Sequence, residues 1–356
     1  MRDSAVAQHE ESNHSRIDIV KSQHDSQVLT VIELRPISLP DRIMIKHARW
    51  YVNVSKWRPT REEWIKLNAS IADEEVVRVN RFVYQDDSKS ALIGRALIRK
   101  FVSHCLEVPS NQVRLSRNQR GRPIVCEAYK SQFNKNWPAI FDFNISHSGD
   151  YCILAGCWSS ECPEWMSPCM TVGADVMRIV DKTGPDLKRF LELMSRREFS
   201  AKEWETVERV SSESQKCINF TRLWCLKESY IKSIGQGLSF NLRRLEFQTA
   251  ESTRFDLTIE SLKNGFLIDT TVLLDGQLAS DWVFMETALD DSHLVALGYH
   301  FCTPVDLNLM RKSIKESHLF EELSITSLVD SLEPIDNNLN ETSWYNFSSK
   351  SNKTKT

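Results

Sequence analysis

Segments with the periodicity of β-strands and segments with that of α-helices are interleaved along the middle of this chain. Apolar and polar residues alternate over residues 51–55, and the apolar runs 141–145 and 151–157 flank a short polar stretch. Apolar side chains recur every three or four residues over 88–106 and 219–234, which is the spacing of one helix face. Antiparallel strands can be joined by a tight turn, so strands and helices mixed in this way predict an α+β fold.

The expected boundaries of the elements follow from capping signals and turn residues. Thr60 with Glu63 three residues later is typical of a helix start, and Gly235 is typical of a helix end. Helices are predicted from residue 60, over 88–106, 186–210 and 219–234 and, as one amphipathic helix, between 304 and 332. Strands are predicted over 51–55, 113–117, 141–145, 151–157, 172–177, 245–247, 258–261, 266–274, 282–287 and 293–299.

Composition divides the chain into a body and two polar ends. The predicted boundaries are 1–43 for a flexible N-terminal extension, 44–168 for an N-terminal subdomain, 169–303 for a C-terminal subdomain and 304–356 for a tail. The stretch Ser159–Met170, with its Pro and Ser residues, is the expected seam between the two subdomains. An apolar patch at 28–34 suits an isolated strand. The tail is expected to be partly helical and then disordered, because 333–356 are crowded with Asn, Ser, Thr and Lys.

Charge and cysteine usage exclude several classes of protein. The 356 residues include 48 acidic and 45 Lys or Arg residues, so the net charge of −3 argues against nucleic acid or a membrane surface as partner. Nine cysteines without a Cys-x-x-Cys pair argue against a zinc ribbon or redox pair and favour a reducing compartment. No apolar run of about eighteen residues and no targeting signal is recognisable, so a cytosolic protein is expected. A monomer is expected as well.

The strand predicted over 172–177 carries one acid. Val172, Ala174 and Val176 share one face of it, and Gly173, Asp175 and Met177 share the other. The first face is a core face. The second offers a carboxylate beside a glycine that lets another group approach the backbone. An Asp that caps a turn at the end of a strand is the alternative, and this segment alone favours it.

The helix predicted over 219–234 carries an acid and a cation on one face. Trp224, Glu228 and Lys232 are four residues apart and lie beside the apolar stripe. One reading is an exposed Glu228–Lys232 ion pair, worth about 0.3–0.5 kcal/mol. The other is an acid for a metal or a proton and a cation for a phosphate, held at a fixed separation. The spacing is the same in both.

Two polar turns complete the set of candidates. His147 lies in the polar stretch 144–150 between two strands, where it either donates to an anion or satisfies a loop carbonyl. Arginines gather around the turn 119–123, which suits phosphate, a nucleic acid or plain exposure to solvent; they are Arg114, Arg117, Arg120 and Arg122. The chain has no Gly-x-x-x-x-Gly-Lys-Ser/Thr and no Gly-x-Gly-x-x-Gly motif, so a bound phosphate would be held by dispersed side chains.

Three segments, taken in order, resemble the Sfp-type 4′-phosphopantetheinyl transferases. They are Phe143-Asn-Ile-Ser-His-Ser-Gly-Asp-Tyr151, Val172-Gly-Ala-Asp-Val-Met177 and Trp224-Cys-Leu-Lys-Glu-Ser-Tyr-Ile-Lys-Ser-Ile-Gly-Gln-Gly-Leu238. The resemblance, which is strongest to the animal subgroup, extends over about residues 47–300 and includes Arg78, the helix 89–100 and the turn 117–123. It implies a pseudo-two-fold α+β fold of two similar subdomains, each with an antiparallel sheet packed on helices.

The same resemblance implies the reaction. Such enzymes move 4′-phosphopantetheine from coenzyme A to a serine of an acyl or peptidyl carrier domain and release adenosine 3′,5′-bisphosphate, with Mg²⁺ as cofactor. Fatty-acid synthase and aminoadipate-type carriers are the expected partners, which would place the chain in fatty-acid synthesis or lysine metabolism.

The site residues implied by the resemblance fall into three groups. Asp175 and Glu228 are the implied Mg²⁺ ligands, with Glu228 also the general base and Lys232 a third catalytic residue. Lys232 and His147 would hold the diphosphate of coenzyme A. The remaining implied coenzyme contacts are Arg78, Arg117, Asn118, Gln119, Arg120, Gly121 and Arg122 around the 3′-phosphate, and Asn144, Ile145 and Ser146 along the base.

One position departs from many bacterial members. They carry a further acid where this chain has Met177, and methionine is a poor Mg²⁺ ligand, so a water is expected in its place. Two other functions are also considered. The first is a Mg²⁺-dependent phosphodiesterase that uses Asp175 and Glu228, and the second is a non-catalytic binder of carriers or nucleic acid that uses the arginine turn.

Overall fold

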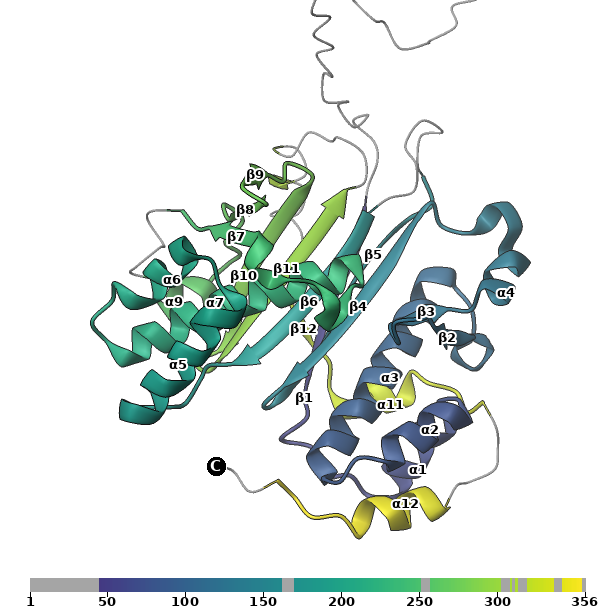
Figure 1. Cartoon of the computed structure of the whole chain (residues 1–356). Helices are drawn as coiled ribbons and strands as arrows, with labels where there is room; N and C mark the ends of the chain where they lie inside the picture. The colour runs from purple at the N-terminus through teal and green to yellow at the C-terminus, as the bar shows by residue number, and fades with distance from the viewer. Residues whose placement is uncertain are drawn as a thin grey trace, which may run out of the picture. The chain divides into compact units, whose positions relative to one another are not determined.

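Two antiparallel sheets and the helices that cover them form the body of the protein (Figure 1). The computed structural model describes residues 45–161, 170–250, 257–301, 308, 311–312, 319–335 and 341–353. The predicted strand at 28–34, most of the predicted seam and most of 304–318 lie outside the described residues. Within the part of the chain that is described, no helix is both long and apolar enough to cross a bilayer.

The first sheet has the strand order β12-β1-β5-β4, and the second has the order β10-β11-β6. Their bounds are β1 Lys46–Asn53, β4 Ile140–Ser148, β5 Tyr151–Ser159, β6 Met170–Arg178, β10 Trp282–Asp290, β11 His293–Phe301 and β12 Glu321–Glu322. All neighbours pair antiparallel except β1 and β12. Strands and helices thus combine as an α+β fold, and this prediction is confirmed.

Helices and small hairpins cover the outer faces. Those near the first sheet are α1 Arg61–Ala69, α2 Asp73–Asn80, α3 Gln85–Leu106, β2 Leu115–Arg117, β3 Pro123–Val125, α4 Glu127–Lys130, α11 Ile325–Asp330 and α12 Glu341–Ser348. Those near the second are α5 Gly184–Glu198, α6 Ala201–Glu208, α7 Glu213–Ile234, β7 Leu245–Gln248, α9 Ile259–Lys263, β8 Thr271–Leu274 and β9 Gln277–Leu278. The predicted caps are present, since Thr60 and Glu63 form a capping box at α1 and Gly235 ends α7 in the left-handed conformation.

The core has three layers of apolar packing. Helix α3 packs through its stripe of Leu92, Ala96 and Phe101 against one face of the first sheet. The other face of that sheet packs against the second sheet, where Val172, Ala174 and Val176 lie as the alternation predicts. Helix α7 covers the outer face of the second sheet with the rest of its apolar side chains.

The two sheets meet along β4 and β6 through side chains rather than through a backbone ladder. Polar side chains at every second position of β4 accept hydrogen bonds from backbone N–H groups at every second position of β6. The four pairs are Val172 N to Asp142 Oδ2 (2.8 Å), Ala174 N to Asn144 Oδ1 (3.0 Å), Val176 N to Ser146 Oγ (3.4 Å) and Arg178 N to Ser148 Oγ (3.2 Å). We call this set the β4–β6 side-chain ladder. It gives the edge of β6 the acceptors that a neighbouring strand would supply.

Four predicted elements differ from the structure. The helix predicted over 186–210 is two helices, because Ser200 and Glu203 form a second capping box that starts α6. The strand predicted over 258–261 is the start of α9, capped by Thr258. The strand predicted over 266–274 is reduced to β8. The single helix predicted between 304 and 332 is wrong for its described C-terminal part, which forms β12 and α11.

The C-terminal segment is ordered where disorder was predicted. Residues 341–353 contain α12, whose Phe347 is 3% exposed and stacks on Trp64 with ring centroids 3.8 Å apart. Lys350 donates to the carbonyl of Asn80 (3.1 Å) and to the hydroxyl of Ser88 (2.9 Å). Polar composition hid this packing, because one buried aromatic ring and one partly buried ammonium group are enough to anchor a short helix.

Candidate active site

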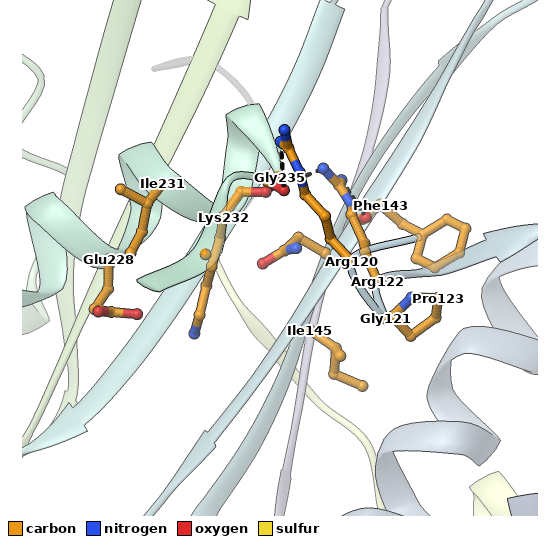
Figure 2. A pocket seen from close by; sticks show the side chains of 12 residues that line it. Arg120, Gly121, Arg122, Pro123, Phe143, Ile145, Glu228, Ile231, Lys232 and Gly235 are labelled. Atoms are coloured by element: carbon orange, nitrogen blue, oxygen red, sulfur yellow. Dashed lines mark hydrogen bonds between the residues drawn. The ribbon is translucent and has the colours of Figure 1, made fainter. Parts of the chain in front are cut away.

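A pocket of about 310 Å³ opens between the β2–β3 turn, strand β4 and the C-terminal half of α7 (Figure 2). Arg120 and Glu228 lie at different walls of it, and Lys232 lies between them. Its lining residues are Arg120, Gly121, Arg122, Pro123, Phe143, Asn144, Ile145, Glu228, Ile231, Lys232, Gly235 and Gly237. Three of the four candidate segments therefore meet at one place.

Asp175 reaches the site from the fourth segment, strand β6. Its Oδ1 accepts hydrogen bonds from Lys232 Nζ (2.5 Å) and from Ser146 Oγ (2.8 Å). Lys232 Nζ also donates to Ser146 Oγ (2.8 Å). Asp175 is 4% exposed, so this is a buried carboxylate held by one ammonium and one hydroxyl group.

Gly173 explains why β6 and α7 lie so close together. A Cβ atom at this position would lie 1.9 Å from the carbonyl oxygen of Ser229 and 2.4 Å from the backbone nitrogen of Ser233. The group that approaches this glycine is therefore the backbone of α7. Because Gly173 and Asp175 share a face, the same close approach brings Asp175 to Lys232.

Glu228 lies one helical turn before Lys232, but Lys232 is ion-paired with Asp175. No ion pair of Glu228 is found among the described residues, so the exposed Glu228–Lys232 ion pair, one of the two readings of this helix face, is not the arrangement that forms. Burial raises the pKa of Glu228, Lys232 lowers it, and the negative charge of Asp175 raises it further. The two carboxylates are thus near enough to repel each other.

The donor set at this point suits a hard divalent cation. Oδ2 of Asp175 is buried and has no hydrogen-bond partner among the described residues. An unpaired carboxylate oxygen beside a second, mutually repelling carboxylate is what Mg²⁺ would neutralise, and Mg²⁺ keeps several waters. Met177 supplies no oxygen and packs against the apolar cluster around α7. The described residues contain no group of three or more His, Cys, Asp and Glu arranged for a metal, so the fit rests on these two acids.

The sequence predicted a turn at Ser146 and His147. In the structure both residues instead lie on strand β4. The turn is confined to Gly149 and Asp150. Asn144 and Ser146 are buried, and their side-chain oxygens accept hydrogen bonds in the β4–β6 side-chain ladder. His147 is exposed, and partial desolvation followed by the positive charge of Lys232 lowers its pKa.

The arginine turn is held to its surroundings by its own side chains. Asn118 Oδ1 accepts from the backbone nitrogens of Arg120 and Arg122 (3.0 Å each), which shapes the turn. Gly121 provides its left-handed position (φ 81°), and Gln119 is exposed. Arg120 Nη1 donates to the carbonyl of Gly235 (3.1 Å) across the pocket.

The remaining two predicted phosphate ligands lie away from the pocket lining. Arg117 forms a bidentate ion pair with Glu75 (2.9 and 2.8 Å) and donates to the carbonyl of Gly121 (2.7 Å). Arg78 is exposed on α2, three residues after Glu75. Glu75 also pairs with Arg95 of α3, so α2, α3 and β2 share one charge network.

Sequence reasoning missed Asp142, which pairs with Arg122 through both of its oxygens. The signal was present, because Asp142, Asn144 and Ser146 alternate with the apolar residues Phe141, Phe143 and Ile145 along β4. It also left Phe143, Pro123 and Ile231 out of the site, although all three lie within the quoted segments and the arginine turn. They form the apolar part of the pocket wall.

Comparison with known proteins gives two adjoining matches. Residues 55–159 match the family described as "4'-phosphopantetheinyl transferase, N-terminal", and residues 171–297 match the "4'-phosphopantetheinyl transferase superfamily". The second match contains Asp175, Glu228 and Lys232, and the first contains the arginine turn and His147.

Individual relatives extend the likeness over most of the chain. The L-aminoadipate-semialdehyde dehydrogenase-phosphopantetheinyl transferase of Homo sapiens is 36% identical over 252 residues, which is 70% of this chain and 74% of the human protein. The protein of the same name from Xenopus laevis is 31% identical over 323 residues, which is 88% of this chain and 96% of that protein. A phosphopantetheinyl transferase of Thraustochytrium is 30% identical over 254 residues, covering 70% and 77% of the two chains.

Proposed function

This chain belongs to the 4′-phosphopantetheinyl transferase superfamily, and we propose that it carries out the Mg²⁺-dependent transfer of phosphopantetheine from coenzyme A to a carrier serine, releasing adenosine 3′,5′-bisphosphate. The observation that carries the proposal is the meeting of Asp175, Lys232 and Glu228 beside a pocket whose other wall is the arginine turn. An acid pair, a cation and a basic turn are the groups that a coenzyme with a diphosphate and a 3′-phosphate requires.

Asp175 and Glu228 are the residues proposed to hold Mg²⁺. The orphaned Oδ2 of Asp175 and the repulsion between the two carboxylates support this assignment. A bound Mg²⁺ supplies charge neutralisation at the attacked phosphorus and at the leaving oxygens. Met177 contributes nothing to that site, so waters are expected to complete it.

Glu228 is also the proposed base for the hydroxyl group of the carrier serine. Burial raises its pKa, so its carboxylate holds a proton more firmly than an exposed glutamate does. A base with a raised pKa accepts a hydroxyl proton more readily, provided that it is ionised at the working pH. Lys232 and His147 are proposed to bind the diphosphate. The positive charge of Lys232 would then offset both the carboxylate of Asp175, which it already contacts, and the negative charge of the substrate.

The arginine turn is proposed as the nucleotide end of the pocket. Arg120 lines the pocket, and Arg117 pairs with Glu75 of α2, the helix that also carries Arg78. We propose these three arginines as the contacts of the 3′-phosphate, with Arg78 and Arg117 reaching it from outside the pocket lining. Asn118, Gln119 and Gly121 shape the turn, and Asn144 and Ile145 line the region proposed for the base. The names of the relatives suggest aminoadipate-type carriers as substrates, and we propose fatty-acid-type carriers beside them.

Carrier mass measures the activity directly. The protein is incubated with coenzyme A, Mg²⁺ and apo carriers of both types, and each carrier is weighed intact and after digestion. One phosphopantetheine on one serine is expected. Release of nucleotide without a carrier, with the carrier unmodified, would instead indicate a phosphodiesterase.

Substitution of the acids tests the assigned roles. Asp175→Asn and Glu228→Gln are each expected to abolish transfer, because an amide neither carries the charge that Mg²⁺ needs nor takes the proton. Glu205→Gln is the matched control, since Glu205 is an exposed helical glutamate with an arginine four residues on. Near-normal turnover by Glu228→Gln would show that Glu228 is an ordinary helix residue like Glu205.

A further inference from the structure

The contacts of Arg122 differ from those expected of a phosphate ligand. We infer that Arg122 and Asp142 are positioning residues: their ion pair fixes the arginine turn against the C-terminal end of α7, and Arg122 does not itself bind the coenzyme. The expected effect of this ion pair on coenzyme binding rests on the proposed function. We call this pair the Arg122–Asp142 latch.

The guanidinium group of Arg122 is already committed to the protein. Its Nη2 donates to Asp142 Oδ1 (2.9 Å) and Oδ2 (2.8 Å) and to the carbonyls of Phe143 (2.8 Å) and Val172 (3.2 Å). Its Nη1 donates to the carbonyls of Lys232 (3.0 Å) and Ser233 (3.1 Å). The side chain is 15% exposed, and that of Asp142 is 21% exposed. Binding a phosphate here would break contacts that a partly buried charge needs.

Asp142 connects the latch to both sheets. The carboxylate that receives Arg122 also accepts from the backbone nitrogen of Val172 (2.8 Å), and so forms one end of the β4–β6 side-chain ladder. Arg122 in turn donates to the carbonyl of the same residue. The β2–β3 turn, β4, β6 and α7 therefore meet at one ion pair.

The latch also holds the end of the helix that carries Lys232. The last carbonyls of a helix lack intrahelical partners and lie at its negative end, where a cation is stabilising. Arg122 fills that role for the carbonyl of Lys232, while the side chain of Lys232 reaches Asp175. Arg120, from the same turn, donates to Gly235 just beyond the helix. Loss of the latch is therefore expected to shift the pocket wall relative to Lys232.

Coenzyme A and dephospho-coenzyme A, which lacks the 3′-phosphate, separate positioning from direct contact. Binding of both is measured by calorimetry for the wild type, Arg122→Gln, Asp142→Asn and the double variant. Each single variant is expected to lower the binding affinity for both coenzymes by the same factor, about tenfold to a hundredfold. A displaced pocket wall affects the whole ligand and not only its 3′-phosphate. The double variant is expected to bind the coenzymes no more weakly than either single variant, since both single substitutions break the same ion pair.

Two results would overturn the latch. If Arg122→Gln removes the preference for coenzyme A while Asp142→Asn keeps wild-type affinity, Arg122 binds the 3′-phosphate directly. If both variants lower the melting temperature but bind coenzyme A normally, the pair stabilises the fold alone. Asp275→Asn is the matched control, because Asp275 forms an exposed bidentate pair with Arg244 away from the pocket lining.

Amide hydrogen exchange tests the latch without a coenzyme. Faster exchange is expected in residues 118–122 and 232–237 for both variants, and unchanged exchange for Asp275→Asn. Unchanged exchange in both variants would refute the latch. If Arg122→Gln does not fold, Arg122→Lys replaces it, because lysine keeps the positive charge but lacks the two-pronged guanidinium group. Faster amide exchange in the same residues is expected for Arg122→Lys as well. A wild type that binds no coenzyme A would count against the proposed function and leave this readout intact.

Discussion

His47 on β1 is half-buried as a residue, but its imidazole nitrogens point away from solvent. Both of its ring nitrogens are buried and lack hydrogen-bond partners among the described residues, and its ring meets that of Tyr299 edge to face at 5.6 Å. Burial, followed by the positive charge of Arg49, lowers its pKa from 6.5 to about 3. The folded protein therefore keeps His47 neutral at a pH where the unfolded chain is protonated.

The stability of the protein should consequently fall in mild acid. Below pH 6.5 the unfolded state binds a proton that the folded state rejects, so the free energy of unfolding falls as the pH drops, by about 2 kcal/mol at pH 5 from this residue. His47→Phe keeps the ring and removes the titration. Urea unfolding at pH 7 and pH 5 should show a smaller loss for the variant, whereas equal losses would mean that His47 titrates normally.

Single residues also mark the limit of prediction at the site. The resemblance of the three ordered segments assigned Asp175, Glu228 and Lys232 to one site, which their spacing alone left open. The structure brings them together because Gly173 admits the helix backbone. The contacts of Arg122 were not predictable, since most of its acceptors are carbonyls of β4, β6 and α7, and any residue type supplies a carbonyl. Only the tertiary fold decides which ones lie within reach.

At the scale of elements, the packing of β6 on α7 depends on one missing side chain. Gly173→Ala is expected to destabilise the protein by about 3 kcal/mol or more and to abolish transfer, because its Cβ would overlap backbone atoms of α7 that have no rotamer to change. Gly265→Ala is the control, as nothing lies within 4 Å of its Cβ position. Thermal unfolding and the carrier assay measure the two effects. A fully active Gly173→Ala would show that β6 and α7 have room to separate.

Helix α12 provides the second test at this scale. Phe347→Ala removes a ring that stacks on Trp64 in the core, and it is expected to cost about 3–5 kcal/mol. Tyr345→Ala, on the same helix but 72% exposed, is expected to change stability by less than about 0.5 kcal/mol. Urea unfolding distinguishes them. Equal effects of the two substitutions would mean that α12 does not pack as described.

The elements that the sequence predicted well are those with strong local signals. Helix α3 has a buried stripe, α7 has a Gly stop, and the paired strands have tight turns. Predictions failed where the local signal was short or ambiguous. Thr258 caps a five-residue helix inside a segment that resembles a strand, and α12 is held by contacts with residues about 280 positions away. Such contacts leave no periodic trace in the sequence.

For the whole molecule, the β4–β6 side-chain ladder determines how the two sheets are joined. Asn144→Leu leaves the buried N–H of Ala174 without its acceptor and is expected to lower the free energy of unfolding by about 1–3 kcal/mol. Asn144→Ser keeps an acceptor oxygen, as Ser146 and Ser148 do at their positions of the ladder, and should lose less. Urea unfolding of the three proteins compares them. If leucine is tolerated as well as serine, this hydrogen bond does not hold the sheets together.

A strand edge with free backbone groups pairs with almost any other strand, which makes it prone to aggregation. The edge of β6 is instead matched by oxygens on alternate side chains of β4, each 30 residues earlier in the chain. A foreign strand with apolar or misaligned side chains cannot reproduce that pattern. The β4–β6 junction therefore makes strand pairing specific. It accepts β4 in one register only, and a strand from another molecule would leave the N–H groups of β6 without acceptors.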